Sequence, residues 1–429
     1  MVRIGTLPMR LLSLKYGAHL VYSEEIIDHK MLTAKRVENK LLGTVDFVLS
    51  DETVVFRTCD IERDKVIFQM GTSCPIRALK VAKLVENDVA GIDINMGCPK
   101  EFSIKGGMGA ALLTKPNVAK EILSTLVNHL NKPVTCKIRV LNNESETIAF
   151  SKLVESTGIA ALAVHGRRKD ERPKHPNRND LIKEIAKTLK IPVIANGGSR
   201  EIKSFANILQ FKEQTGCSSI MLARAAQWNP MIFCESPKEF NPVKVCREYT
   251  KIAIDFDQHP INVKYVLQQF LHEDLENDLA RKILASGELN EICSALDLMD
   301  YFVDALQKRS KLKELLEKPL GRTICPTKRK LENGEEIIEM DFKYIRRAYL
   351  ENRTPKLVLY EYCIKQGWKC PTYEAIYYRD EHLFEASVTV NSLKYKSTIR
   401  DKSKKLVEQA AASVCLQSFG INDGRKIYS

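Results

Sequence analysis

Residues 91–109 read GIDINMGCPKEFSIKGGMG, and this stretch decides how the N-terminal half of the chain is interpreted. The apolar run over residues 89–94 is short and rich in β-branched side chains, which is typical of a parallel strand buried on both faces. Asn95 and Cys98 follow where that strand ends, and the glycines at the end of the stretch allow a close approach of backbone to a ligand. Because loops at strand C-termini carry the chemistry of α/β barrels, Cys98 is a candidate active-site acid. Taken alone, the same cysteine also fits a small buried hydrophobic residue.

Segments of this kind alternate with amphipathic helical segments from the N-terminus to about residue 235. The predicted strands are residues 20–23, 66–70, 91–95, 134–140, 161–164, 192–195 and 219–223, and the predicted helices include 8–16, 75–86, 116–130, 144–157 and 180–188. This repetition predicts an α/β fold with a parallel sheet. We expect a (β/α)8 (TIM) barrel over residues 1–235, with a truncated first strand of which residues 1–3 are the last part. An open, doubly wound sheet is the alternative, because strand order cannot be inferred from the pattern.

Three further regions follow the expected barrel. Residues 240–318 nearly lack glycine and carry apolar residues at helical spacing, which predicts a helical domain. Residues 319–345 are dense in charge and interrupted by proline and glycine, which is typical of a linker. Residues 346–419 form the last predicted domain, and residues 420–429 a tail. The predicted elements of the domain at 346–419 are a helix at 355–366, strands at 373–379, 383–390 and 393–398, and a helix at 402–418.

Composition narrows the class of protein. The chain has 429 residues, 44% hydrophobic, and no apolar stretch approaches the roughly 18 residues that span a bilayer, so no membrane partner is expected. Its twelve cysteines include no Cys-x-x-Cys pair and do not cluster with histidine, so no metal is expected. Scattered single thiols suit a reducing compartment, and we expect a cytoplasmic protein. Basic residues without acidic ones before Glu24 leave a mitochondrial fraction open, and a nuclear fraction also stays open.

Positive charge is concentrated near the C-terminus. Residues 341–429 carry 16 basic and 10 acidic side chains, which is half of the net charge of +12. Lys404 and Lys405 stand at the start of the last predicted helix, where free N–H groups and the helix dipole also favour phosphate. The pattern indicates a polyanionic partner, with a merely solvated surface as the alternative.

Two resemblances to known families arise from these motifs. The α-β-β-β-α order with Lys404 and Lys405 resembles a double-stranded RNA-binding domain (dsRBD). The segment around Cys98, together with CKIR at 136–139, VHGR at 164–167 and NGG at 196–198, resembles the tRNA-dihydrouridine synthases. The combination is similar to the eukaryotic subfamily that modifies the position-20 uridine of the tRNA D-loop.

The resemblance implies an NADPH-driven, FMN-dependent reduction of a uridine in tRNA. Reduced flavin would deliver hydride to C6, and Cys98 would protonate C5, since a thiol is protonated in the cell yet acidic enough to act. Lys137 would stabilise negative charge on the flavin, and Arg224 would bind its phosphate. The residues placed against FMN are Met1, Val2, Gln69, Lys137, His165, Asn196, Gly197, Gly198, Ala223 and Arg224.

The same resemblance implies that tRNA binds at the barrel mouth and at the C-terminal domain. The residues expected to hold the target base and its phosphates are Asn95, Lys100, Arg139 and Arg167, and those expected to bind the RNA backbone are Arg346, Arg347, Lys356, Lys404 and Lys405. Two other functions stay open. One is an FMN barrel oxidoreductase of a small molecule, and the other is a catalytically silent dsRNA-binding or regulatory protein.

Overall fold

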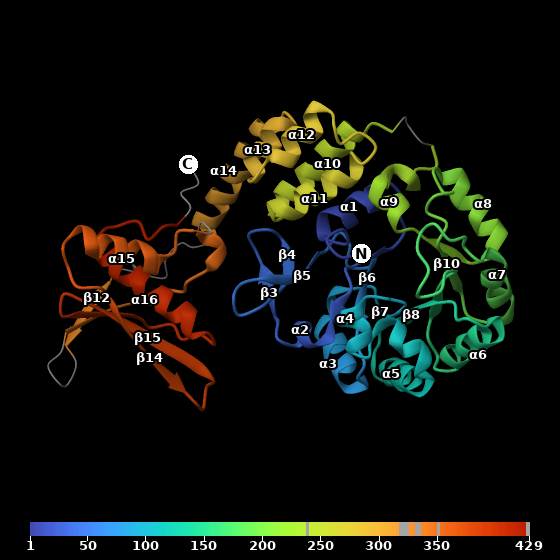
Figure 1. The fold of residues 1–429 in the computed structure, drawn as a ribbon, viewed down its shortest axis with the longest axis horizontal. Helices are drawn as coiled ribbons and strands as arrows, with labels where there is room; N and C mark the ends of the chain where they lie inside the picture. The colour runs from blue at the N-terminus through green and yellow to red at the C-terminus, as the bar shows by residue number, and fades with distance from the viewer. Residues whose placement is uncertain (237–239, 317–325, 331–335, 350–351, 426–429) are drawn as a thin grey trace. The chain divides into compact units, whose positions relative to one another are not determined.

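The structure is a computed structural model that describes residues 1–236, 240–316, 326–330, 336–349 and 352–425, together with the backbone but not the side chain of Arg347. It divides into two compact units. The first comprises Met1–Phe47 and Val54–Leu316, and the second Val48–Thr53 and Glu317–Ser429 (Figure 1).

A parallel sheet of short, buried strands forms the centre of the first unit. Its strands pair in the order β1 (Val21–Tyr22), β6 (Val66–Gly71), β7 (Gly91–Met96), β8 (Val134–Arg139), β9 (Ala161–His165), β10 (Val193–Asn196) and β11 (Ser219–Met221). A further two-residue strand, β2 (Ile26–Ile27), pairs with the end of β6. All six residues of β6 are buried, as expected for a parallel strand covered on both faces. The seven predicted strands are therefore confirmed.

The order of the strands decides between the two predicted architectures. Each strand on this path pairs in parallel with the next one along the chain, and the direction never reverses. A doubly wound sheet requires a reversal of strand order, whereas a TIM barrel adds its strands in sequence. The α/β fold of TIM-barrel type is confirmed, and the doubly wound alternative is wrong.

Helices cover the outside of this curved sheet (Figure 1). They are α3 (Pro75–Val85), α5 (Pro116–His129), α6 (Glu144–Glu155), α7 (Asn179–Thr188) and α8 (Phe205–Thr215). Proline at the first position starts α3 and α5, where its missing N–H costs nothing. Asn143 and Ser204 cap α6 and α8 through their side-chain oxygens. The shorter elements are α1 (Leu7–Lys15), α2 (Asp28–Leu32), η1 (Glu86–Asp88), α4 (Glu101–Lys105), η2 (Gly109–Thr114), α9 (Arg224–Trp228) and η3 (Pro230–Phe233).

Two features of the N-terminal region differ from the prediction. Residues 1–3 are not the end of a strand, because the amides of Ile4 and Gly5 bond to the Met1 carbonyl and close a turn in which Arg3 has a φ of 65°. A separate sheet, β3 (Lys35–Asn39), β4 (Thr44–Val48) and β5 (Val54–Cys59), was not predicted. Nearly every residue of β3 is exposed, so its sequence lacks the alternation that marks a half-buried strand.

Five helices follow the sheet: α10 (Pro242–Asp255), α11 (Pro260–Phe270), α12 (Asp278–Ala285), α13 (Leu289–Ala295) and α14 (Met299–Leu316). Their core contains Tyr249, Leu267 and Phe270, and Leu12 of α1 packs into it. Tyr249 and Phe270 meet edge to face with ring centroids 5.7 Å apart. In the described part of the chain, no helix is long and apolar enough to cross a membrane.

The second unit contains α15 (Pro355–Lys365), β14 (Thr372–Tyr378), β15 (Leu383–Val390), β16 (Leu393–Ser397) and α16 (Lys404–Ser418), which confirms the predicted α-β-β-β-α order. Both helices pack against the sheet through a core that includes Leu359, Val388 and Cys415. The short helix η4 (Arg346–Ala348) precedes α15.

The interval expected to be a charged linker, residues 319–345, contains two strands. β12 (Thr327–Lys330) pairs with β13 (Glu336–Met340), and β13 pairs in parallel with β16, so the sheet has the order β12-β13-β16-β15-β14. Charge hides the strand pattern, because Glu339 on β13 is paired with Lys396 on β16 at 3.3 Å. The apolar signal rests on a few residues, of which Ile337 and Met340 are buried.

Candidate active site

The loop after β7 holds Cys98 in a fixed position. Asn95 Oδ1 accepts hydrogen bonds from the amides of Gly97 (3.0 Å) and Cys98 (2.9 Å), and the amide of Ala110 donates to the Cys98 carbonyl (3.0 Å). Asn95, predicted to contact the target base, thus also shapes the loop that carries Cys98. The Cys98 side chain is half-buried.

The surroundings of Cys98 keep its sulfur protonated. Burial raises the pKa of the Cys98 thiol above its ordinary value, and the negative charge of Glu25 raises it further. A sulfur with this pKa is a thiol at neutral pH. This is the protonation state that a general acid needs before it acts.

Strand β8 contributes two cations from its C-terminal end. Burial, and then the positive charge of Arg139, lower the pKa of Lys137 to about 8. No hydrogen bond or ion pair to the Lys137 ammonium occurs within the described residues, and the side chain is only half-buried. Arg139 donates from Nε to the Gly97 carbonyl (2.8 Å) and from Nη1 to the Arg168 carbonyl (2.9 Å). Arg139 thereby ties the Cys98 loop to the loop after β9.

Strand β9 ends in a histidine that stays neutral. Burial lowers the pKa of His165 to about 2, and the positive charges of Lys137 and Arg139 add to this effect. Arg167 is 2% exposed, bonds to the His175 carbonyl at 2.8 Å and lies 3.4 Å from His165 Nε2. Its guanidinium is therefore built into the site and is not a surface charge.

A buried polar network links β6 and β7. Gln69 donates to Asp93 Oδ2 (2.9 Å) and accepts from Asn95 Nδ2 (3.3 Å), while Thr135 donates to Asp93 Oδ1 (2.7 Å). Burial raises the pKa of Asp93 to about 6. The network fixes Gln69, one of the predicted flavin-binding residues, at the end of β6.

The loop after β10 contains two glycines that form a cradle. Gly197 and Gly198 have φ of 121° and 63°, and a β-carbon at Gly197 would lie 2.0 Å from Asn177 Oδ1. Asn177 Oδ1 is buried without a hydrogen-bond partner among the described residues. The predicted Asn196 side chain donates to the Met221 carbonyl (2.8 Å), which holds the ends of β10 and β11 together.

Positive charge gathers beside this cradle. Ala223 immediately precedes α9, and Arg224 is its first residue. Burial lowers the pKa of Arg224, and the charges of Arg167 and Arg200 lower it further, so three guanidinium groups lie near one another. A cradle that excludes a β-carbon, clustered guanidinium groups and the unpaired ammonium of Lys137 fit a phosphate-bearing, electron-rich cofactor such as FMN.

Met1 and Val2, also predicted to contact FMN, have exposed side chains, with relative exposures of 38% and 62%. Burial lowers the pKa of the Met1 amino group, while the charges of Glu24 and Glu25 raise it. Only this end of the predicted pair reaches the cluster around Lys137.

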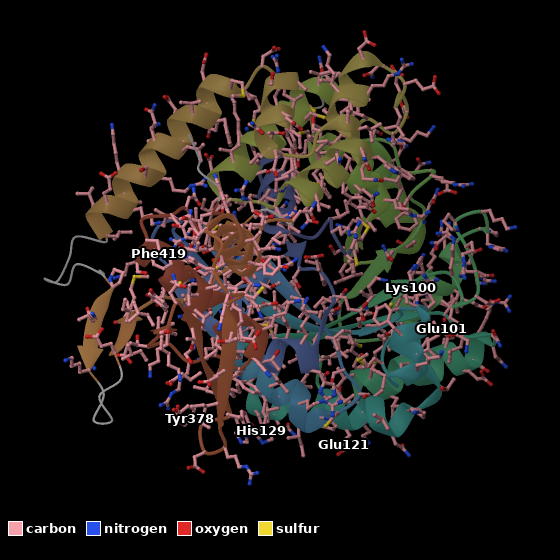
Figure 2. All side chains as sticks on the ribbon, turned by 60° about the vertical axis from the view of Figure 1, so that its left-hand side comes forward. Lys100, Glu101, Glu121, His129, Tyr378 and Phe419 are labelled. Atoms are coloured by element: carbon pink, nitrogen blue, oxygen red, sulfur yellow. The ribbon has the colours of Figure 1, made fainter. Side chains whose placement is uncertain are left out.

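The predicted RNA-binding residues lie in varied surroundings. Lys100 is exposed just before α4 (Figure 2), and Arg346, Lys404 and Lys405 are exposed in the second unit. Lys356 is instead engaged within its own unit, where its ammonium bonds to Glu408 Oε2 at 2.6 Å and lies 4.1 Å from the centre of the Tyr373 ring. The Arg347 side chain lies outside the described residues.

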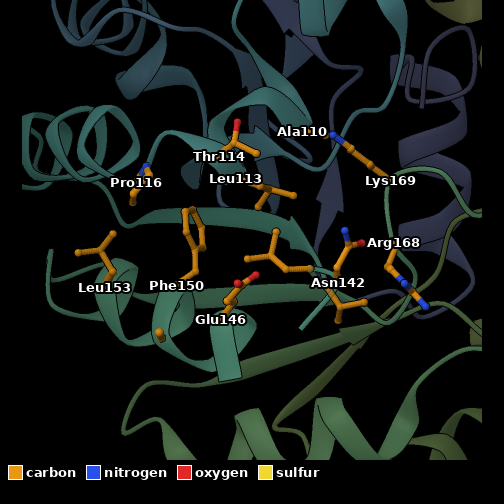
Figure 3. A pocket seen from close by; sticks show the side chains of 13 residues that line it. Ala110, Leu113, Thr114, Pro116, Asn142, Glu146, Phe150, Leu153, Arg168 and Lys169 are labelled. Atoms are coloured by element: carbon orange, nitrogen blue, oxygen red, sulfur yellow. The ribbon is translucent and has the colours of Figure 1, made fainter. Parts of the chain in front are cut away.

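A separate cavity of about 560 Å³ lies between η2, α5 and α6 (Figure 3). Leu113, Phe150 and Leu153 form part of its apolar wall, and Arg168 and Lys169 line it as well. Cys98, Lys137 and His165 do not line this cavity, so it is distinct from the site at the strand ends. In the part of the chain that the structure describes, no group of three or more His, Cys, Asp or Glu could hold a metal ion.

Three residues of the site were missed by the sequence analysis: Glu25, Asp93 and Ser103. Glu25 follows β1 as Cys98 follows β7, so the rule that polar residues after a strand form the site could have found it. Asp93 carried the signal of a carboxylate inside an apolar strand. Ser103 lies on the short helix α4 and carried no such signal.

Two regions of the chain match known protein families. Residues 1–318 match the dihydrouridine synthase (Dus) family, and residues 355–418 match the double-stranded RNA binding motif. The tRNA-dihydrouridine(20) synthase [NAD(P)+] of Schizosaccharomyces pombe is 36% identical over 310 residues, which are 70% of this chain and 64% of that protein. The Saccharomyces cerevisiae protein of the same name is 39% identical over 289 residues, which are 63% of this chain and 75% of that protein.

Among solved structures, a mutant of the human tRNA-dihydrouridine(20) synthase dsRBD is 46% identical. The match covers 21% of this chain and 97% of the human domain, with a TM-score of 0.21. The Dus match extends over most of this chain, so the chain belongs to the dihydrouridine synthase family.

Proposed function

We propose that this protein reduces a D-loop uridine of tRNA, at position 20, to 5,6-dihydrouridine, with FMN as cofactor and NADPH as reductant. The observation that carries the proposal is the pairing of a protonated, half-buried Cys98 with an unpaired Lys137 at neighbouring strand ends, beside a glycine cradle. The names of the two yeast relatives support both the reaction and the position. When bound, FMN reduced by NADPH supplies the hydride for C6 of the base.

Cys98 supplies the proton. Its S–H bond breaks as the proton moves to C5, and the electron pair stays on sulfur. Because burial keeps the pKa of Cys98 high, the thiol is fully protonated before the reaction, and proton loss requires a strongly basic carbanion or enolate at the base. This restricts proton transfer to the moment at which C5 becomes basic.

Other residues would bind and orient the cofactor. Lys137, with a pKa of about 8, carries its positive charge at neutral pH and would attract an electron-rich flavin ring. His165 is neutral, so it would offer a hydrogen bond without a competing charge. Gly197, Gly198 and Arg224 would hold the cofactor phosphate through backbone N–H groups and a guanidinium.

The target base must leave its stack to reach Cys98, which favours an unpaired loop uridine. Arg139, which bonds to the Gly97 carbonyl, and the exposed Lys100 would contact the base or its phosphates. The C-terminal unit would grip the tRNA body by shape and phosphate contacts, with Lys404 and Lys405 at the start of α16.

The test uses unmodified tRNA transcripts, the purified full chain, FMN and NADPH. We expect one dihydrouridine per tRNA at position 20 and none in a transcript in which that uridine is replaced by cytidine. Dihydrouridine at another position would contradict the assignment to position 20. A preparation that binds no flavin but binds double-stranded RNA would favour the silent RNA-binding protein, and reduction of free pyrimidines without response to tRNA would favour a small-molecule oxidoreductase.

A further inference from the structure

A carboxyl group that none of the comparisons assigns lies against the Cys98 loop. Glu25 stands between β1 and β2, and β2 pairs with the end of β6 through Ile27 and Gly71. Gly71 provides the space for its side chain, because a β-carbon there would lie 3.0 Å from Glu25 Oε1. Since β6 is the neighbour of β7, this brings the carboxyl to the strand end that carries Cys98.

Glu25 and Cys98 face each other directly. The negative charge of Glu25 raises the pKa of Cys98, and Cys98 in turn lowers the pKa of Glu25. Glu25 Oε1 is buried, and it has no hydrogen-bond partner among the described residues. The carboxyl is therefore not used by the surrounding fold as a structural ion pair.

A hydroxyl lies on another side of the sulfur. Ser103 is fully buried, and its Oγ lacks a partner of ordinary geometry in the described residues. A β-carbon at Gly109 would lie 2.4 Å from Ser103 Oγ and 3.0 Å from Cys98 Cβ, so both side chains meet at this glycine. The Ser103 hydroxyl lowers the pKa of Cys98, opposite in sign to the effect of Glu25.

We infer that Glu25 is a positioning residue and the proton partner of Cys98: it holds the sulfur in its thiol form and returns a proton to it after each turnover. This inference rests on the proposed function. In the return step the O–H bond of the Glu25 carboxylic acid breaks and its proton forms the S–H bond. The carboxylate is then reprotonated by a hydronium ion of the solvent, which leaves as water.

The direction of the return step follows from the chemistry of the two groups. A thiol ordinarily has a pKa near 8.5 and a carboxylic acid near 4.3, so transfer from Glu25 to the Cys98 thiolate runs downhill. Burial raises the pKa of Glu25, which increases the protonated fraction of its carboxyl at neutral pH. Glu25 is only half-buried, so protons can reach it from water.

Other charged groups act on the same pair. Those facing Glu25, besides Cys98, are the Met1 amino group, Lys137 and Asp93; those acting on Cys98, besides Glu25, are Lys137, Arg139 and the dipole of the Lys100 amide. The cations lower the pKa of both groups, and burial outweighs them. A substitution of Glu25 alone therefore measures the contribution of Glu25 to the pKa of Cys98.

The first experiment measures the rate of Cys98 alkylation by iodoacetamide against pH in the full chain, followed by mass spectrometry of the Cys98 peptide. In Glu25→Gln we expect the midpoint of the curve of alkylation rate against pH to fall by about one pH unit, because a negative charge is removed. At a pH below that midpoint, alkylation should be roughly tenfold faster than in wild type. Glu25→Asp retains the charge and should stay near wild type. Glu24→Gln is the matched control, since Glu24 bonds to the Arg3 amide and should leave the midpoint unchanged.

Ser103→Ala supplies an independent variant with the opposite sign. Loss of the Ser103 hydroxyl should raise the midpoint of Cys98 alkylation. An unmoved midpoint in Glu25→Gln, an equal shift in Glu24→Gln, or no rise in Ser103→Ala would overturn the arrangement of the sulfur between a carboxyl and a hydroxyl.

The second experiment follows product formation with excess tRNA. Glu25→Gln should form about one dihydrouridine per active site at the wild-type rate and then slow, because the thiolate waits for its proton. A steady-state rate equal to wild type would contradict the return step. If wild-type protein makes no dihydrouridine, the proposed function fails, while the alkylation profile still tests the Glu25–Cys98 pair.

Discussion

Two regions of this chain, the barrel site and the start of α16, use charge in opposite ways. In the strands of the barrel, Lys137, His165 and Asp93 are desolvated, and their pKa values move to about 8, 2 and 6. At the start of α16, Lys404 and Lys405 are exposed, and no hydrogen bond or ion pair to either ammonium occurs within the described residues. In the first region burial changes the pKa values of the side chains. In the second, two exposed lysines carry positive charge that is available to a polyanion.

The difference follows from the cost of burial. A buried ionisable group changes its pKa by desolvation and by its neighbours, so small changes of position alter reactivity. An exposed lysine keeps its charge and its hydration, so it contributes affinity that falls as salt rises. Variants of the barrel site should therefore act on rate, cofactor binding or acid stability, and variants of α16 on the salt dependence of RNA binding.

The largest expected effect is that of Cys98→Ala on turnover. Loss of a general acid should lower the rate of dihydrouridine formation by about 10²–10⁴-fold while flavin and tRNA binding persist. Product is measured in the transcript assay, and flavin by its absorbance. Cys370→Ala, which removes an exposed thiol in the second unit, is the control. A near-wild-type rate in Cys98→Ala would remove the acid role.

Gly197→Ala should destabilise the protein and weaken FMN binding. Alanine would adopt a φ of 121° and place its β-carbon 2.0 Å from Asn177 Oδ1, which costs about 2–4 kcal/mol in strain and overpacking. Thermal melting and flavin titration measure the two effects. Gly43→Ala also places alanine at a positive φ, 63°, but this lies in the left-handed α region and the new β-carbon meets nothing within 4 Å, so it should cost less. Equal losses in both variants would contradict the close approach at the cradle.

Lys404→Ala combined with Lys405→Ala should weaken tRNA binding by about tenfold. The slope of log affinity against log salt should fall by roughly two phosphate contacts, while reduction of the flavin by NADPH stays unchanged. Lys365→Ala with Lys369→Ala removes the same charge from exposed positions of the same unit and should change affinity less. An equal loss in both double variants would indicate general electrostatic attraction without a defined grip.

The smallest expected effect is on acid stability. Because the pKa of His165 is lowered to about 2 in the folded protein, the unfolded chain binds one more proton between pH 2 and 6.5, and stability falls as pH falls through that window. His165→Gln should remove this loss, on the order of 1–2 kcal/mol at pH 5. Denaturant unfolding of wild type and variant at pH 7 and pH 5 measures the difference. The exposed His129→Gln should show no such difference, and a wild-type pH dependence in His165→Gln would exclude a buried neutral imidazole.

Local sequence patterns predicted the strand ends well. Lys137 and His165 each stand near the end of an apolar β-branched run, and in the structure Lys137 acts on both Cys98 and His165. The rule works because parallel strands bring their carboxyl ends to one edge, whatever the distance between them along the chain. It failed at residues 327–340, where paired charges mask two strands.

The sequence by itself determined the alternation of strands and helices, the polar residues at strand ends and the basic start of the last helix, because these depend on neighbours a few positions apart. Only the tertiary structure decided that the strands follow one another without reversal, that Lys356 pairs with Glu408, and that Glu25 meets Cys98. Such contacts depend on which distant segments share a strand end and on how deeply a side chain is buried. Desolvation and pairing, which set the pKa values of the site, are properties of that packing and not of the local sequence.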